Sequence, residues 1–285
     1  MLRSLFSGIS GLRVNQTMLD VTGNNIANAN TTGFKSSTTV FQDTLSQVMN
    51  GAGAANPNNN GGTNPVQVGL GVQLAATVTN LGQGSEQTTG RATDLMLSGD
   101  GMFVVRKGNE TLYTRAGAFS FDNAGTLVSP TGNRVQGYAL DADGAATGPL
   151  IDVTRNTANA VPAVPAGVEM TSYSIGSDGK VTGLFSDGIQ RGLAQIAIAD
   201  FTNPQGLEKV GETSFRVTAN SGEAEVGVAG QGGRGTVKGG SLEMSNVDLA
   251  AEFTNLILAQ RGFQASSRVI TTSDQVLEEL VNIKR

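Results

Sequence analysis

The chain has 285 residues, enough for one large domain or two smaller ones with real hydrophobic cores. It carries 24 Asp and Glu against 19 Lys and Arg, so it lacks a basic surface for a phosphate backbone, and we expect no nucleic-acid partner. Cys, His and Trp are all absent, which excludes thiol nucleophiles, disulfides, thiolate or imidazole metal sites and any Ser-His-Asp triad.

The opening of the chain, MLRSLFSGISGLRVNQT, mixes polar residues and Gly with apolar ones at every second or third position. A signal peptide has an uninterrupted apolar region, so we expect no cleaved signal peptide here. No stretch of the chain approaches the roughly 18 apolar residues of a membrane helix, so we expect no membrane insertion. Export by a route that reads another signal stays open.

Residues 1–29 have the period of an α-helix. A seam at alternating spacings of three and four residues is typical of a coiled coil; it comprises Leu2, Leu5, Ile9, Leu12, Gln16, Leu19, Gly23 and Ile26. Gly8, Gly11 and Gly23 each lower the stability of this helix by about 1 kcal/mol. We predict a helix that is marginal on its own.

Residues 30–90 read as an extended connector. Within it, residues 50–65 have the sequence NGAGAANPNNNGGTNP, which cannot bury enough apolar area to offset the entropy of ordering. We predict a mobile loop there.

Residues 91–245 change to a period of two, with turn residues such as Asp-Gly and Pro-Thr-Gly at short intervals. This pattern predicts an antiparallel β domain. The strands that we expect are Met102 to Arg106, Thr111 to Arg115, Ala118 to Phe121, Asn133 to Leu140, Val181 to Phe185, Gln195 to Phe201 and Thr213 to Thr218.

Residues 246–285 return to the helical period, and we predict a helix from about 247 to 283, capped by residues 245–248. Its seam is Leu249, Phe253, Leu256, Gln260, Phe263, Ser267, Ile270, Asp274, Leu277 and Val281. A second apolar stripe runs next to that seam, at Ile257, Val269, Val276, Leu280 and Ile283. Two stripes make the apolar face wider than one partner helix covers, so we expect more than one neighbour.

These elements predict an α+β fold, with an N- and C-terminal helical coiled coil (residues 1–29 and 246–285) and a central antiparallel all-β domain. Apolar stripes on helices usually pack on the core of their own domain. Here they are long and lie at both chain ends, which favours self-assembly. The predicted self-assembly interface consists of Leu2, Leu5, Ile9, Leu12, Leu19, Ile26, Leu249, Phe253, Leu256, Phe263, Ile270, Leu277 and Val281.

Three short patterns that suggest chemistry fail on their context. Gly230–Gly235 fits G-x-G-x-x-G, but no helix can open at those glycines, so we interpret it as a turn. Ser177–Lys180 has S-x-x-K spacing with Asp-Gly in its middle, which makes a turn. Asp141–Asp152 resembles a calcium loop but has Ala at the position that requires Gly, so a hairpin is favoured. We predict no catalytic residue, no cofactor and no metal.

Several longer motifs resemble the bacterial flagellar rod and hook protein family, and they span almost the whole chain. At the N-terminus these are SLFSGISGL, VTGNNIAN and NTTGFK. The β domain contributes TGRATDL before GDGMF, and YTRAGAF. At the C-terminus they are SNVDL, AQRGF and TSDQ.

The resemblance implies a structural subunit, not an enzyme, whose terminal helices pair and then contact neighbouring copies in a tubular filament around an export channel. It implies export by the flagellar type III apparatus and a place in the hook or basal body. Expected partners are copies of the chain itself, other axial proteins (rod, hook–filament junction and hook cap) and the export apparatus.

The opening SLFSGISGL and the phrase FTNPQGL favour a hook protein, which transmits torque, over a distal rod protein. The chain is short for a hook protein, so the distal rod is the alternative. An extracellular β-rich carbohydrate-active or carbohydrate-binding protein is a further alternative, disfavoured because the chain has three Tyr and no Trp for sugar platforms.

Overall fold

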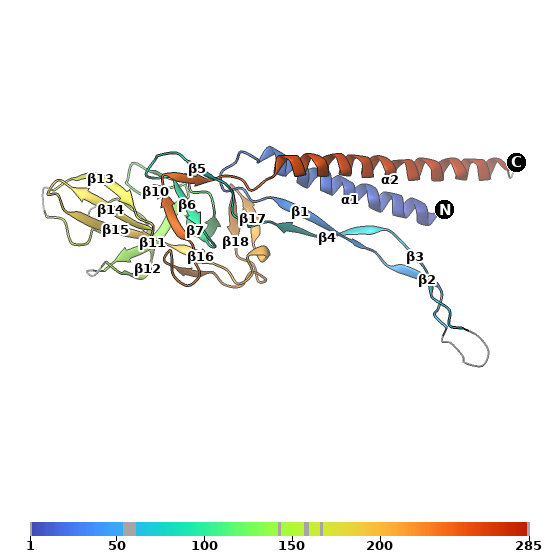
Figure 1. The fold of residues 1–285 in the computed structure, drawn as a ribbon, viewed down its shortest axis with the longest axis horizontal. Coiled ribbons are helices and arrows are strands. Elements are labelled where there is room, and N and C mark those ends of the chain that lie inside the picture. The colour runs from blue at the N-terminus through green and yellow to red at the C-terminus, as the bar shows by residue number, and fades with distance from the viewer. Residues whose placement is uncertain (1, 54–60, 142–143, 157–159, 166–167, 284–285) are drawn as a thin grey trace. The chain divides into compact units, whose positions relative to one another are not determined.

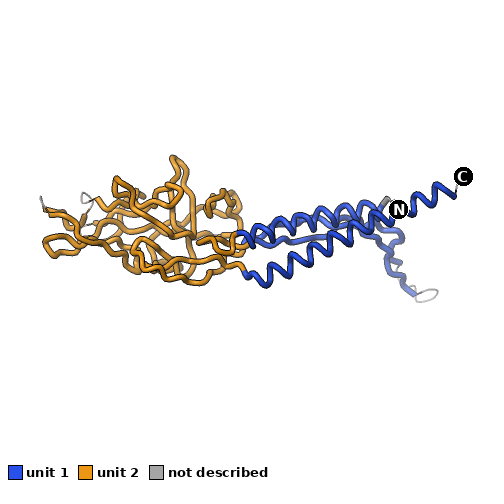
Figure 2. Tube along the Cα trace, turned by 90° about the horizontal axis from the view of Figure 1, so that it is seen from above, with its two compact units in different colours: residues 1–27, 37–79, 248–285 blue, residues 28–36, 80–247 orange. Residues whose placement is uncertain are grey.

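The computed structural model describes residues 2–53, 61–141, 144–156, 160–165 and 168–283. The chain forms two compact units, shown in different colours in Figure 2. The helical unit contains residues 1–27, 37–79 and 248–285, and the β unit contains residues 28–36 and 80–247. Each unit therefore combines segments that are far apart in the sequence.

The helical unit contains two long helices, α1 (Leu2–Ala27) and α2 (Leu249–Ile283), which run side by side (Figure 1). The carboxylate of Asp248 caps α2, because its Oδ1 accepts hydrogen bonds from the amides of Ala250 at 2.9 Å and Ala251 at 3.2 Å. The predicted start and end of this helix are thus confirmed to within two residues. Among the described residues, no helix has the length and apolar character that crossing a membrane would require.

Two antiparallel strand pairs complete the helical unit. β1 (Ser37–Asp43) pairs with β4 (Val72–Thr79), and β2 (Ser46–Asn50) pairs with β3 (Val66–Gly69). The segment that we expected to be a plain connector therefore forms a two-part hairpin. Part of the predicted mobile loop, residues 54–60, lies outside the described residues.

The β unit is built around a 13-stranded antiparallel sheet, which confirms the predicted α+β class. The main path of hydrogen-bonded neighbours is β13-β14-β15-β11-β7-β8-β18-β17. Its strands are β7 (Met102–Lys107), β8 (Glu110–Thr114), β11 (Arg134–Leu140), β13 (Met170–Ile175), β14 (Lys180–Phe185), β15 (Gln190–Ile196), β17 (Glu208–Gly211) and β18 (Ser214–Arg216).

Shorter strands pair at the sides of this path or form separate two-stranded ladders. On the sheet these are β9 (Ser120–Phe121), β10 (Leu127–Val128), β12 (Ala146–Asp152), β16 (Ile198–Asp200) and β19 (Glu225–Gly227). The separate ladders are β6 (Leu95–Ser98) with β20 (Thr236–Gly239), and β5 (Glu86–Thr88) with β21 (Ser241–Glu243). A single turn of 3₁₀-helix spans Pro204–Gly206.

Alternating side chains of the sheet fill two apolar cores in the β unit. In the larger one, the rings of Phe103 and Phe119 meet edge to face at 5.4 Å between centroids. In the smaller one, Tyr113 and Phe201 meet in the same way at 4.9 Å. The β unit therefore has its own core.

Most of the predicted strands are confirmed, with two corrections. The strand expected at residues 118–121 is shorter, since β9 covers only Ser120–Phe121. Residues 195–201 were expected to form a single strand, but the structure ends β15 at Ile196 and starts β16 at Ile198. The reason is a change of partner, since β15 pairs with β14 and β11 whereas β16 pairs with β7 and β19. The predicted turn at residues 177–180 is confirmed between β13 and β14, with Gly179 at a φ of 77°.

Candidate assembly interface

Small residues make several of the closest contacts between α1 and α2. Ser4 meets Ser273 at 3.4 Å between their hydroxyl oxygens. A Cβ atom at Gly8 would lie 3.0 Å from Cγ1 of Ile270. The two helices are antiparallel, because the first turns of α1 meet the last third of α2.

Two glycines allow the helices to approach closely. A Cβ atom at Gly11 would lie 2.8 Å from Oγ of Ser266, and one at Gly262 would lie 2.5 Å from Oδ1 of Asn15. Real Cβ atoms do not come this close to oxygen, so a larger residue at either position would force the facing side chain or the helix to move. Gly11, which lowers the helix propensity of α1, therefore also allows α2 to approach closely.

A buried amide joins three parts of the helical unit. Asn25, near the end of α1, is 1% exposed. Its Nδ2 donates to the carbonyl of Ser37 at 2.7 Å, and its Oδ1 accepts from the amide of Ser37 at 3.0 Å. The same Nδ2 donates to Oε1 of Glu252 at 3.0 Å. Asn25 thus fixes the first residue of β1 and the first turn of α2 to α1.

Large apolar side chains are exposed on both helices. Phe6 on α1 is 65% exposed. On α2 the exposed large apolar residues are Leu249, Phe253, Ile257, Leu258, Phe263, Val269, Val276, Leu280, Val281 and Ile283. Exposed apolar side chains in such number mark an interaction surface more often than a free one. We call this set the outer apolar face of α2.

The structure divides the predicted interface residues into two groups. Half-buried residues are Leu5, Ile9, Leu12, Leu19, Ile26, Leu256, Ile270 and Leu277. Exposed ones are Leu249, Phe253, Phe263 and Val281. The side chain of Leu2 lies outside the described part of the chain, although its backbone belongs to α1. The second stripe of the sequence, from Ile257 to Ile283, is exposed at each of its five positions.

The β unit is fastened by a buried ionic cluster that sequence reasoning did not identify. Nζ of Lys35 lies 2.6 Å from Oε1 of Glu243 and donates to the carbonyl of Gly82 at 2.8 Å. Arg115 lies 3.4 Å from Oε2 of the same carboxylate and donates to the carbonyl of Gly99 at 2.7 Å. The cluster joins the segment after α1, the middle of the β unit and β21.

Burial is the largest influence on the pKa values of the two cations in this cluster. Burial lowers the pKa of Lys35, and the hydrogen bond and charge of Glu243 oppose that shift. Burial likewise lowers the pKa of Arg115, and the charge of Glu243 opposes it. Lys35 and Arg115 belong to two of the motifs that resemble a family, and in the structure both bind the buried carboxylate of Glu243. No sequence spacing could have paired them with Glu243.

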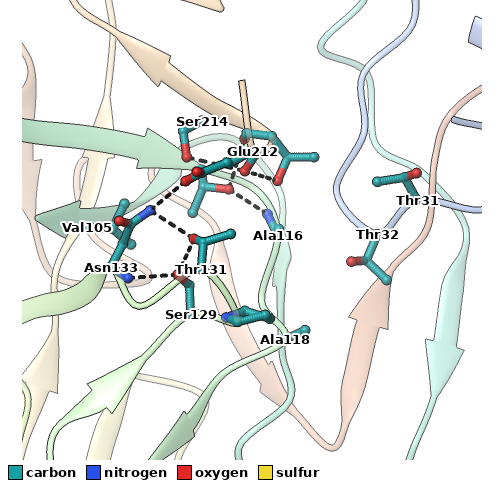
Figure 3. A pocket seen from close by; sticks show the side chains of 13 residues that line it. Thr31, Thr32, Val105, Ala116, Ala118, Ser129, Thr131, Asn133, Glu212 and Ser214 are labelled. Atoms are coloured by element: carbon teal, nitrogen blue, oxygen red, sulfur yellow. Dashed lines mark hydrogen bonds between the residues drawn. The ribbon is translucent and has the colours of Figure 1, made fainter. Parts of the chain in front are cut away.

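A cavity of about 220 Å³ in the β unit is lined mainly by small and hydroxyl-bearing residues (Figure 3). Nδ2 of Asn133 donates to Oγ1 of Thr131 at 3.1 Å and to Oε2 of Glu212 at 3.4 Å. A hydrogen bond from Lys107 at 3.1 Å is the main reason why the pKa of Glu212 lies below its usual range. The carboxylate is thus held ionised by bonds within the protein, unlike a general acid, whose pKa is raised.

Among the described residues, no group of three or more Asp or Glu side chains could hold a metal ion. The segment from Asp141 that resembles a calcium loop connects β11 and β12 as a hairpin. The backbone carbonyl of Asp141 accepts a hydrogen bond from the amide of Gly144 at 2.8 Å. Residues 142 and 143 of that segment lie outside the described part of the chain.

This architecture defines a class of α+β proteins whose two chain ends pair as long helices and whose middle folds as an antiparallel β unit. Three family models match the chain. They are "Flagella basal body rod protein" over residues 5–35, "Flagellar hook protein FlgE/F/G D1 domain" over residues 96–183 and "Flagellar basal body rod FlgEFG protein C-terminal" over residues 238–283.

Full-length relatives agree with these models. The chain is 46% identical over 286 positions to the flagellar basal-body rod protein FlgG of Bacillus subtilis, covering 100% of both chains. It is 34% identical over 289 positions to FlgG of Borreliella burgdorferi, again over 100% of both. To the flagellar hook protein FlgE of Borreliella burgdorferi it is 31% identical over 443 positions, with 100% of both chains covered.

The chain belongs to the bacterial flagellar rod and hook protein family, as its motifs predicted. It is a structural protein of the bacterial flagellum, and proteins of this family belong to the basal body or the hook. These relatives are named as rod and hook proteins, which are structural components and not enzymes.

Proposed function

We propose that the chain is a subunit of the distal rod of the flagellar basal body and not an enzyme. One observation carries this choice. The alignment with a rod protein runs over 286 positions, about the length of this chain, whereas the alignment with a hook protein runs over 443. The hook protein therefore contains additional sequence that this chain lacks. Identity is also higher to the rod protein, at 46% against 31%.

The hook, which the opening motif favoured, is the second candidate. It is supported by hook proteins of Borreliella burgdorferi and Treponema pallidum, which are 31% and 30% identical over the whole chain. The comparisons favour the rod over this reading.

In this proposal, copies of the chain assemble through contacts made by α1 and α2. The outer apolar face of α2 and the predicted interface residues find cover in neighbouring copies stacked along an axis. Contacts that use two different surfaces on each copy do not close and so produce a helical filament. Rod, junction and hook proteins with similar helices would continue the same packing at the ends of the filament.

Export by the flagellar type III apparatus fits the same helices. Gly8, Gly11 and Gly23 make α1 weak by itself, so the chain ends become ordered only when they acquire partners. A chain that is easily unfolded suits passage through a narrow channel.

Electron microscopy of basal bodies that carry an epitope-tagged copy of the chain tests the proposal. We expect the antibody label on the straight segment between the rings and the hook. Label along the curved hook would instead establish the second candidate. Loss of the chain should leave basal bodies without that distal segment.

A further inference from the structure

An uncovered groove runs between α1 and β4 in the helical unit. It has a volume of about 480 Å³ and is lined by Phe6, Ile9, Arg13 and Val14 of α1 and by Leu74 of β4, among others. The amide of Val72 on β4 donates to Oγ of Ser10 on α1 at 3.3 Å, and this hydrogen bond joins the two walls of the groove.

This groove lies on the side of α1 that α2 does not use. Residues at positions 4, 8, 11 and 15 contact α2. The groove is lined from positions 6, 9, 10, 13, 14 and 17, which helical spacing places on the opposite side. Phe6 is 65% exposed and Leu74 39% exposed, so the groove is uncovered in the single chain.

The last two turns of α2 expose most of their large apolar side chains. Contacts of Ser4 with Ser273 and of Asn25 with Glu252 define one antiparallel register along the pair. In this register the first residue of α1 lies level with residues near 275, so α2 continues past α1 from Val276 to Ile283. Figure 1 shows the C-terminal end of α2 extending beyond the N-terminal end of α1. We call residues 276–283 the overhang.

The overhang and the groove are complementary, because both are apolar and they carry opposite charges. Val276, Leu280 and Ile283 are spaced i, i+4, i+7 and so lie on one side of the helix. They are 48%, 55% and 85% exposed. Glu279 lies next to this apolar stripe, and the groove presents the exposed cation Arg13.

We propose that the overhang of one copy docks into the α1–β4 groove of the next copy, with Glu279 paired to Arg13. The inference rests on the proposed function, because it assumes that the chain polymerises. A copy cannot fill its own groove, since Leu280 and Arg13 are separated by roughly 20 Å along the axis of a continuous helix pair at 1.5 Å per residue. Groove and overhang are different surfaces, so their contact repeats without closing.

Charge exchange on the full-length protein tests the pairing, with sedimentation velocity measuring the concentration at which polymers form. Arg13→Glu and Glu279→Arg should each raise that concentration about threefold to fivefold. The double variant should return it toward the wild-type value. The docking would be refuted if both single variants assembled like the wild type. It would also be refuted if the double variant assembled worse than either single variant. A wild-type chain that stays monomeric at all concentrations would instead count against the proposed function.

A cross-linking experiment tests the contact independently of charge, because the chain contains no cysteine. Leu280→Cys and Ile9→Cys chains, mixed before assembly and then oxidised, should form a disulfide-linked dimer. The matched control mixes Leu280→Cys with Thr254→Cys, an exposed position on α2 outside the groove. Equal dimer yields from both mixtures would refute the docking.

Discussion

The ammonium group of Lys35 lies 2.6 Å from Oε1 of Glu243, and both side chains are completely shielded from solvent. The two residues are 208 positions apart in the sequence. Their contact joins the segment that follows α1 to the strand that precedes α2, both within the β unit.

Removing one partner of this buried pair should destabilise the β unit strongly. Lys35→Met leaves Glu243 buried with only Arg115 as a cation, and we expect a loss of roughly 3–5 kcal/mol in the free energy of unfolding. Urea denaturation followed by tyrosine fluorescence would measure it. Lys238→Met is the matched control, since Lys238 also lies 2.6 Å from a carboxylate, that of Glu86, but its side chain is 56% exposed. A loss as large in the control would show that burial is not the cause.

Two glycines in the helices should respond to alanine in opposite directions. Gly262→Ala places a Cβ atom 2.5 Å from Oδ1 of Asn15 and should lower the melting temperature of the helices, at a cost of about 1–3 kcal/mol. Gly23→Ala meets no atom within 4 Å and should stabilise α1 by about 0.5–1 kcal/mol. Circular dichroism at 222 nm on heating reads both effects. Stabilisation by both substitutions would mean that α1 and α2 do not pack this closely.

A charge on the outer apolar face of α2 should block assembly without unfolding the subunit. Ile257 is 58% exposed, so Ile257→Asp costs the single chain little, whereas in a polymer it would bury a carboxylate without a partner. We expect helical content to stay unchanged and polymers to disappear in sedimentation and negative-stain microscopy. Thr254→Asp introduces the same charge at a nearby exposed polar position and should assemble. Polymers of normal length from the Ile257 variant would remove this face from the interface.

Acid should weaken the hairpin of β11 and β12 through Asp152. Burial raises the pKa of Asp152, but hydrogen bonds from Gln136 and Arg134 and the charges of Arg106 and Arg134 outweigh it and hold the pKa below the ordinary 3.8. The folded pKa is depressed, so this stabilisation is complete above 3.8 and is lost as the pH falls through the folded value.

Asp152→Asn isolates that contribution. The variant should be less stable than the wild type by about 1–3 kcal/mol at neutral pH, because Arg106 loses a carboxylate that lies 2.7 Å away. The difference between the two proteins should shrink as the pH falls below 3.8. Differential scanning calorimetry between pH 7 and pH 2.5 measures both. A constant difference over this range would contradict the depressed pKa.

The sequence predicted the helices and part of the central sheet because their periods are regular, but it missed β12, β13 and most of β15. Spacings of three and four residues placed the end of α2 correctly, and alternation found β7, β8, β11 and β14. Strands β1 to β4 were not predicted, since Asn, Gln, Thr and Gly dominate that segment and its strands are largely exposed. Strand propensity is weak evidence where no face is buried.

Two features of the candidate site were out of reach of the sequence. A helical stripe reveals which residues share a side, but it does not reveal which side faces the partner helix. We placed the largest residues in the seam, whereas the structure gives part of the closest contact to Gly8, Gly11 and Gly262. Long-range pairs such as Lys35 with Glu243 depend on the whole fold, which local patterns do not contain.

Because many large apolar side chains of α2 are exposed, much of the free energy that could stabilise this helix is gained only when those side chains are buried against other molecules. In the proposed filament, helix formation is therefore linked to binding, and it obeys mass action. The helices should melt at a temperature that climbs with protein concentration, while the β unit, with its own core, melts at a constant one. A subunit of this kind stays pliable when dilute and becomes rigid where copies accumulate.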